Sequence, residues 1–319
     1  MTARIEITNL SIKLQGRTMI DDLSFAVEPG DVFGLLGPSG AGKTCLMRAL
    51  VTLLKPAGGD ILVGGYSVKS SPEMVREITG YIPGKFGVYS HMSVWEYLDF
   101  FGACSGIAKN ESRILINDLL ELVELQPRKD QPAVELSSGM KQRLSIARAL
   151  LHDPKVLVFE NPLADLDPLA RVEFRDLIFE LGQLGKTVIY SSNHLSDINA
   201  VCSRVGILDK GKLIAYGSIQ ALGEQIKGSR ILEITVMGDG EKTASMLSDN
   251  PFISNTTRLA QNRSNTQTNF QIEYNGDDEN LAVLFADLAQ AGIKVLNFNE
   301  ISTGLEKIFR RAVKGNLHH

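Results

Sequence analysis

An eight-residue motif near the N-terminus restricts this chain to a small set of folds. It reads G-x-x-x-x-G-K-T, and its members are Gly37, Pro38, Ser39, Gly40, Ala41, Gly42, Lys43 and Thr44. An apolar run precedes it at residues 32–36, and helical apolar spacing follows at residues 45–50. Glycine N–H groups and a helix N-terminus bind phosphate, while Lys43 can reach the β- and γ-phosphates and Thr44 can ligate Mg²⁺. The motif predicts a strand–loop–helix nucleotide site; a glycine turn without a ligand fits this context less well.

Composition favours a cytoplasmic protein of about two domains. The chain has 319 residues, 44% of them hydrophobic, and a formal net charge of −4. This length allows two domain cores, and the acidic balance gives no reason to expect a nucleic-acid partner. No apolar run reaches about 18 residues, so we expect no membrane span, and the N-terminus lacks the apolar segment of a signal peptide. Its cysteines, Cys45, Cys104 and Cys202, are odd in number and far apart, which suits a reducing compartment and suggests neither a cysteine-ligated metal site nor a disulfide framework.

Apolar patterns predict an α/β fold with a mostly parallel sheet. Two alternating segments, Arg4–Leu14 and Met19–Val27, predict a pair of antiparallel strands beside that sheet. Five shorter, nearly continuous apolar segments predict buried parallel strands, and helical spacing lies between most of them. Those segments are Val32–Leu36, Ile78–Ile82, Lys155–Phe159, Thr187–Tyr190 and Val205–Leu208.

Two changes of pattern predict the domain organisation. Between residues 93 and 151 the strand patterns disappear, which predicts a helical subdomain within a nucleotide-binding domain of residues 1–227. Its predicted helices are Val94–Cys104, Ser112–Glu124 and Gly139–His152. The second change is a shift of composition near residue 228. We therefore predict a small α+β accessory domain at residues 228–319, and a ferredoxin-like arrangement is one hypothesis for it.

Within this C-terminal domain the sequence predicts elements but no catalytic site. Strands are expected at residues 231–236, 270–274 and 293–298, and helices at residues 241–247, 279–291 and 305–312. The polar, Asn-rich stretch 254–268 predicts a hairpin loop or a mobile connection. Dimerisation or regulation is the role we expect for this domain.

A second motif indicates which nucleotide-binding family the chain resembles. The motif is Leu136, Ser137, Ser138, Gly139 and Met140, continued by Lys141-Gln142-Arg143. It resembles the L-S-G-G-Q signature of ABC-type ATPases, although taken alone its serines would also suit an ordinary helix N-cap. In that family two ATPase domains pair head to tail, and the signature of one covers the γ-phosphate bound to the glycine loop of the other. The resemblance therefore implies ATP and Mg²⁺ as ligands of a P-loop NTPase core.

The resemblance covers roughly residues 4–225 and implies further site residues. Residues 78–83 resemble the strand that leads into the family's Q-loop. Asp165 and Asp167 lie in a segment that resembles the D-loop, which crosses the dimer interface. His194 ends a segment that resembles the H-loop, so its imidazole is expected to contact the γ-phosphate.

Three places depart from the family pattern. Glu160 and Asn161 stand where the family has Asp and then Glu, which hold the Mg²⁺ shell and polarise the attacking water. Glu160 can still ligate Mg²⁺ with Thr44, but the Asn161 amide cannot accept a proton; the alternative is that Asn161 positions water while another group is the base. Gly84 takes the Q-loop glutamine position, and Leu14 lies where the family stacks an aromatic ring on adenine.

The resemblance implies the ATP-binding subunit of an ABC transporter, of the bacterial ABC-2-type and drug-resistance exporter kind. Such a subunit is peripheral on the cytoplasmic face of the cell membrane. The implied partners are a polytopic permease on a separate chain and a second ABC ATPase domain, in a homodimer or a heterodimer. We expect weak hydrolysis at the chain's own site. The alternative is an ATP-sensing regulatory module without transport.

Overall fold

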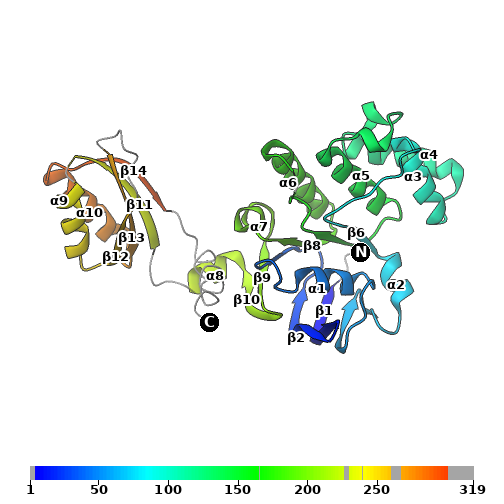
Figure 1. The fold of residues 1–319 in the computed structure, drawn as a ribbon, viewed down its shortest axis with the longest axis horizontal. Helices are drawn as coiled ribbons and strands as arrows, with labels where there is room; N and C mark the ends of the chain where they lie inside the picture. The colour runs from blue at the N-terminus through cyan, green and yellow to red at the C-terminus, as the bar shows by residue number, and fades with distance from the viewer. Residues whose placement is uncertain (1–3, 165, 226–229, 239, 260–266, 301–319) are drawn as a thin grey trace. The chain divides into compact units, whose positions relative to one another are not determined.

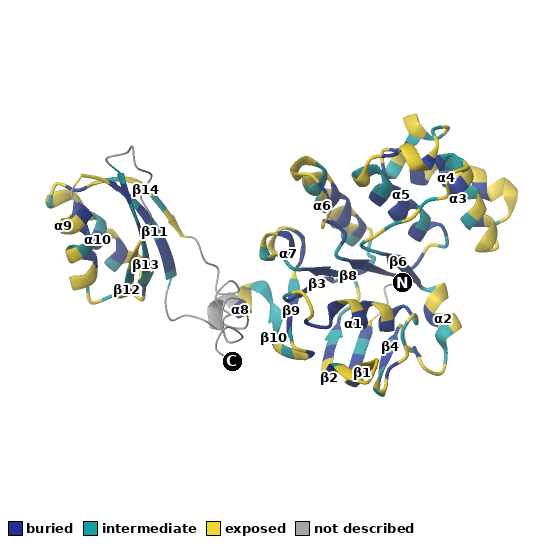
Figure 2. Ribbon diagram, viewed as in Figure 1, coloured by how far each residue is buried: buried dark blue, intermediate teal, exposed yellow. Residues whose placement is uncertain are grey.

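The structure contains two compact units. The computed structural model describes residues 4–164, 166–225, 230–238, 240–259 and 267–300. Backbone contacts divide the chain into Met1–Ile219 and Gln220–His319, shown in Figure 1. Each unit has its own cluster of buried apolar side chains, visible as dark blue in Figure 2. None of the described helices combines the length and apolar character that a bilayer crossing requires.

A six-stranded sheet forms the centre of the first unit. Its strand order is β10-β9-β3-β8-β7-β6, and all neighbours are parallel except β9 and β10. Every residue of β3, β7 and β8 is buried, as expected for apolar strands covered on both faces. The prediction of a mostly parallel α/β sheet is thus confirmed, and the carboxyl ends of β3, β7 and β8 lie side by side. The strands are β3 (Val32–Leu36), β6 (Thr79–Ile82), β7 (Val156–Glu160), β8 (Thr187–Ser192), β9 (Arg204–Asp209) and β10 (Lys212–Ser218).

Helices cover both faces of this sheet (Figure 1). On one face lies α1 (Lys43–Leu50), and on the other lie α6 (Pro168–Gln183) and α7 (Leu195–Val201). The start of α6 is fixed by Asp167, whose carboxylate accepts a hydrogen bond from the Ala170 N–H at 2.9 Å.

A second, antiparallel sheet packs against α1. Its order is β2-β1-β4-β5. Ile12 of β1 and Leu46 of α1 belong to the same buried cluster, so the two elements share a core. The sequence predicted β1 and β2 but not β4 and β5, because glycines interrupt the apolar pattern there. The elements are β1 (Ile5–Leu14), β2 (Arg17–Val27), β4 (Gly58–Val63), β5 (Tyr66–Ser67) and the following α2 (Pro72–Glu77).

The predicted helical segment is present between β6 and β7. It contains α3 (Val94–Cys104), α4 (Lys109–Leu122), η1 (Gln126–Arg128), η2 (Ala133–Glu135) and α5 (Ser138–Leu150). The bounds of α3 match the prediction because Ser93 and Glu96 form a capping box at its start. α4 begins three residues before its predicted start, because its first turn is polar and carries no apolar periodicity.

The second unit contains a four-stranded antiparallel sheet of order β12-β13-β11-β14, and α9 and α10 lie on one face of this sheet (Figure 1). In β13, buried residues alternate with half-buried ones, as expected for a sheet covered on one face. The chain follows a β-α-β-β-α-β order. After α8 (Ile219–Gln225), its elements are β11 (Arg230–Met237), α9 (Gly240–Asp249), β12 (Ile253–Arg258), β13 (Gln267–Tyr274), α10 (Asp278–Gln290) and β14 (Lys294–Glu300).

One C-terminal prediction was wrong and another lies outside the described residues. The stretch 254–268, predicted as a loop, begins with most of β12, which pairs with β13. This strand is at the sheet edge and largely exposed, so its sequence is polar and lacks apolar alternation. The helix predicted at residues 305–312 falls outside the part of the chain that the structure describes.

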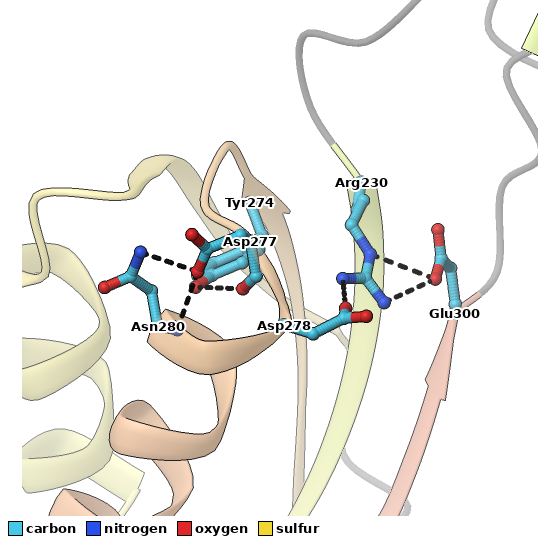
Figure 3. A network of polar contacts seen from close by, with 6 residues as sticks. All are labelled: Arg230, Tyr274, Asp277, Asp278, Asn280 and Glu300. Atoms are coloured by element: carbon cyan, nitrogen blue, oxygen red, sulfur yellow. Dashed lines mark hydrogen bonds and ion pairs between the residues drawn. The ribbon is translucent and has the colours of Figure 1, made fainter. Parts of the chain in front are cut away.

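Ion pairs join the first and last strands of this unit (Figure 3). The Arg230 guanidinium, on β11, donates two hydrogen bonds to the Glu300 carboxylate on β14, at 3.1 and 2.9 Å. It also pairs with Asp278 in the first turn of α10. Beside it, Asp277 caps α10 by accepting a hydrogen bond from the Asn280 N–H at 2.8 Å. Three elements distant in sequence are thereby joined at one end of the sheet.

Candidate nucleotide-binding site

The loop of residues 37–44 joins β3 to α1 in a conformation that its glycines permit. Gly40 and Gly42 have φ angles of 84° and 105°, in the left-handed region that residues with a Cβ avoid. A Cβ on Gly37 would lie 2.3 Å from the carbonyl oxygen of Leu208, so no larger residue fits. Because α1 begins at Lys43, the positive end of its helix dipole lies at this loop.

Lys43 is folded back into its own loop. Its ammonium donates hydrogen bonds to the carbonyl oxygens of Gly37 at 2.6 Å and Pro38 at 2.9 Å. The side chain is 8% exposed, and burial lowers the pKa of Lys43 to about 8. It forms no ion pair with any carboxylate in the described part of the chain. Because no described carboxylate neutralises its charge, the buried ammonium can form an ion pair with a phosphate.

A cavity of about 280 Å³ opens over this loop. Residues from the loop, from the end of β7 and from the end of β8 meet around it. Those predicted from the sequence are Ser39, Gly40, Gly42, Lys43, Thr44 and Asn161. Those not predicted are Met19, Cys45, Ser191 and Asn193. Leu14, Glu160, His194 and Gly84 do not line it.

Asn161 reaches the cavity through an unusual backbone conformation. Its φ is 45°, in the left-handed region that Asn tolerates better than most residues. Its N–H donates to the Ser191 hydroxyl at 2.9 Å, which joins the end of β7 to β8. The side-chain amide can orient a polar ligand or a water molecule, but it cannot remove a proton.

Glu160, the preceding residue, is directed elsewhere. Its carboxylate accepts a hydrogen bond from the Tyr81 hydroxyl and lies 3.9 Å from Nε of Arg48. Burial and then the hydrogen bond to Glu160 raise the pKa of Tyr81, so the phenol stays protonated as the donor. The carboxylate predicted to bind Mg²⁺ is therefore engaged by two side chains outside the cavity lining.

The segment after β8 places Asn193, rather than His194, at the cavity. Asn193 lies 3.5 Å from the Ser39 hydroxyl, measured from Nδ2 to Oγ. His194 is exposed and is the residue before α7; its backbone N–H donates to the Ser192 hydroxyl at 2.9 Å. The Ser192 hydroxyl in turn donates to the buried Asp197 carboxylate at 3.1 Å. This fixes the backbone around His194 while leaving its imidazole accessible.

The signature residues lie at a different cavity, of about 330 Å³. The Ser137 hydroxyl accepts a hydrogen bond from the Met140 N–H at 3.2 Å and so caps α5, while Leu136 is buried. Arg143 on α5 pairs with Glu124 and Glu173, each at 2.8 Å, and holds the helix in place. The lining includes Ser137, Gly139, Met140 and Asp167; Ser138 is exposed beside them, and Asp165 lies outside the described residues.

Comparison with known proteins shows the family to which this chain belongs. Residues 20–164 match the ABC transporter family. The chain is 31% identical over 237 residues to the linearmycin resistance ATP-binding protein LnrL of Bacillus subtilis, covering 74% of this chain and 76% of that protein. The chain belongs to the ABC transporter family of ATP-binding proteins.

Further similarities agree with this membership. The chain is 35% identical over 232 residues to the Nod factor export ATP-binding protein I of Burkholderia thailandensis, covering 73% of this chain and 76% of that one. A solved structure of an ATP-binding subunit of an ABC transporter resembles it with a TM-score of 0.63 and 27% identity, over 69% of this chain and 92% of that chain. The predicted family and P-loop NTPase fold are confirmed, and with them ATP binding and, at the level of the family, ATP hydrolysis.

In this ABC protein, Gly84 is packed too closely for a side chain. It follows β6, and a Cβ there would lie 2.7 Å from the carbonyl oxygen of Glu160. The segment is also held by Gln142 of α5, whose amide donates to the Pro83 carbonyl at 3.3 Å. The missing Q-loop glutamine is therefore accompanied by a local backbone that leaves no room for one.

Restoring glutamine at this position is expected to destabilise the protein. Gly84→Gln should lower the free energy of unfolding by about 2 kcal/mol, because the new Cβ must displace backbone atoms. Thermal melting should show a decrease of about 5 °C. Gly87→Gln is the matched control, since nothing lies within 4 Å of a Cβ there. Equal melting temperatures for the two variants would refute this account.

Proposed function

We propose that this chain is the ATP-binding subunit of an exporter, located at the cytoplasmic face of the cell membrane and coupled to a polytopic permease on a separate chain. Family membership supports the transport role. Export is supported by two relatives, one named for linearmycin resistance and one for Nod factor export. Nucleic acid is not among the proposed partners.

Mg-ATP is the proposed ligand of the loop cavity. The buried Lys43 ammonium and the loop N–H groups suit the phosphates. The Thr44 hydroxyl lines the cavity and would bind Mg²⁺, while Glu160 would contribute directly or through water. The described residues contain no preformed group of three acidic, His or Cys ligands, which fits an ion held mainly by phosphate oxygens and water. His194 is the proposed contact to the γ-phosphate, and Leu14, 45% exposed, is the proposed cover for adenine.

A head-to-tail pair with a second ABC ATPase domain completes the proposal. Ser137 and Gly139 line a cavity that shares no residue with the loop cavity of the same chain. This separation supports the idea that the signature serves a phosphate bound to another copy or to a different cassette. Asp165 and Asp167 of the D-loop would lie at that interface.

Weak hydrolysis at the chain's own loop is the last part of the proposal. Its main support is Asn161, which brings an amide, and no carboxylate, to the cavity. The engaged position of Glu160 and the packed Gly84 add to it. The chain would then hold ATP as a stable link between two domains.

Ser138→Asp tests the pairing without weakening the fold. Ser138 is exposed and is the first residue of α5, where a carboxylate stabilises the helix dipole but repels an incoming γ-phosphate. We expect ATP-dependent dimerisation, measured by sedimentation velocity with Mg-ATP, to weaken about tenfold. The isosteric, uncharged Ser138→Asn should dimerise like the unmodified chain.

The same experiment can contradict the proposal. If Ser138→Asp and Ser138→Asn dimerise equally, the signature does not contact phosphate. If the unmodified chain binds ATP yet remains a monomer, its partner must be a different cassette. Failure to bind ATP at all would remove the basis of the whole proposal.

A further inference from the structure

A hollow of about 680 Å³ lies in the helical segment, separate from both cavities described above. The starts of α3 and α4 and the loop after η1 form its walls. Its lining consists of Trp95, Lys109, Asn110, Arg113, Asn117, Lys129 and Asp130. None of these residues has a role in the nucleotide site or in the signature cavity.

Backbone hydrogen bonds give this hollow a rigid frame. The Val94 N–H donates to the Gln131 carbonyl at 3.0 Å, and the Trp95 N–H donates to the Lys129 carbonyl at 2.9 Å. The start of α3 is therefore joined directly to the loop that carries Lys129. On α4, the Asn117 carboxamide accepts a hydrogen bond from the Gln126 amide of η1 at 3.3 Å. The lining is thus built on fixed elements rather than on a free loop.

The charge of the hollow is strongly positive for its size. Lys109, Arg113 and Lys129 are three cations against the single carboxylate of Asp130, a net charge of +2. None of the three forms an ion pair with a carboxylate among the described residues. α4 also begins here without a side-chain cap, so its positive dipole end adds to the potential. Such a concentration of unpaired positive charge attracts an anion.

Trp95 adds an apolar surface and a donor to these charges. It is the one tryptophan of the chain and is half-buried in the wall of the hollow. Within the described residues its ring stacks on no other ring, and its indole N–H donates no hydrogen bond. An indole of this kind can contact the organic part of a ligand while its N–H binds an oxygen.

We propose that this hollow binds a phosphate ester, with the phosphate among Lys109, Arg113 and Lys129 and the organic group against Trp95. A phosphate matches the net charge of +2 better than a single carboxylate, and Arg113 can bind two of its oxygens at once. Two sources share this chemistry: the headgroup of an anionic lipid and a soluble phosphate ester. The proposal does not depend on hydrolysis or pairing at the nucleotide site.

Because Trp95 is the only tryptophan, its emission reports on the hollow alone. The full-length protein is titrated with vesicles of phosphatidylglycerol, vesicles of phosphatidylcholine, and soluble glycerol 3-phosphate. We expect a saturable change in emission with phosphatidylglycerol vesicles, with glycerol 3-phosphate, or with both. The double variant Lys109→Gln/Arg113→Gln should bind at least about tenfold more weakly. Its melting temperature and ATP affinity serve as folding checks.

The control variant removes the same charge elsewhere. Lys55→Gln/Lys155→Gln replaces two exposed lysines of the first unit, away from the hollow, and should leave the titration unchanged. A response to vesicles alone assigns the site to lipid, and an equal response to glycerol 3-phosphate assigns it to a soluble ester. The proposal is overturned if no anionic probe changes the emission, if phosphatidylcholine acts as strongly, or if both double variants weaken binding equally.

Discussion

Replacing Asn161 by glutamate is expected to raise ATP turnover of the purified protein about 100-fold, since a positioned general base contributes roughly two to four orders of magnitude to rate. Asn161 lines the cavity together with Lys43 and Thr44, so a carboxylate introduced at this position would lie close to bound phosphates. The backbone is held by the hydrogen bond from its N–H to the Ser191 hydroxyl, which does not depend on the side chain. Steady-state release of phosphate at saturating Mg-ATP is the measurement.

Asn161→Gln is the matched control for this experiment. Glutamine has the length of glutamate and has the same difficulty at a φ of 45°, where residues other than Gly, Asn and Asp lose about 1 kcal/mol. Any loss of stability should therefore be equal in the two variants, and only the glutamate variant should gain activity. If turnover stays near zero in both, the position of Glu160 or Gly84 limits the reaction more than the missing base.

The glycine loop and its surroundings could be predicted because their chemistry is local. The positive φ angles at Gly40 and Gly42 and the close approach of Gly37 to Leu208 require glycine, so the motif carries its own conformation. Buried parallel strands also have a direct sequence pattern, since both faces are apolar. The start of α3 was predictable for the same reason, because the Ser93 and Glu96 capping box is encoded within four residues.

Features that depend on distant contacts could not be predicted in this way. The Mg²⁺ role of Glu160 stays a prediction, and the sequence does not show that its carboxylate contacts Tyr81 and Arg48, which are far away in sequence. The sequence shows at Gly84 only the loss of the glutamine side chain, whereas in the structure the carbonyl oxygen of Glu160 also occupies the space that a Cβ would need. In each case the contact joins segments far apart in sequence, and the sequence alone does not show how these segments are aligned with each other.

Asn193 and β12 illustrate two weaker signals. Asn193 and His194 both follow the end of β8, where the sequence predicts residues of the nucleotide site. The sequence does not show which of these two neighbours lines the cavity, and in the structure it is Asn193. β12 is polar because it is an exposed edge strand, and its pattern is hard to separate from that of a loop.

The affinity for ATP is expected to fall about 30-fold between pH 7 and pH 9.5, because phosphate binding requires the protonated form of Lys43. Burial lowers the pKa of this ammonium to about 8. A bound polyphosphate favours the charged form and raises that pKa, so binding above pH 8 must be accompanied by uptake of a proton. At pH 7 the ammonium is already mostly protonated and little is lost; at pH 9.5 only about one molecule in 30 carries the proton.

The other ionisable groups at the cavity, the phosphate and Cys45, do not explain a decrease in ATP affinity above pH 8. The phosphate has lost its last proton below about pH 7 and adds no change above it. Cys45 also lines the cavity, but burial raises the pKa of its thiol, which keeps it neutral over most of this range. The expected decrease in affinity above pH 8 therefore belongs to Lys43.

Calorimetry can separate this effect from general weakening at high pH. Titration at pH 8 in two buffers of different ionisation enthalpy should show uptake of about half a proton per ATP bound. Lys43→Arg keeps its charge throughout and should bind more weakly but with no dependence on pH and no proton uptake. If the arginine variant follows the same pH curve as the unmodified protein, then another group controls binding and the buried ammonium is not the phosphate contact.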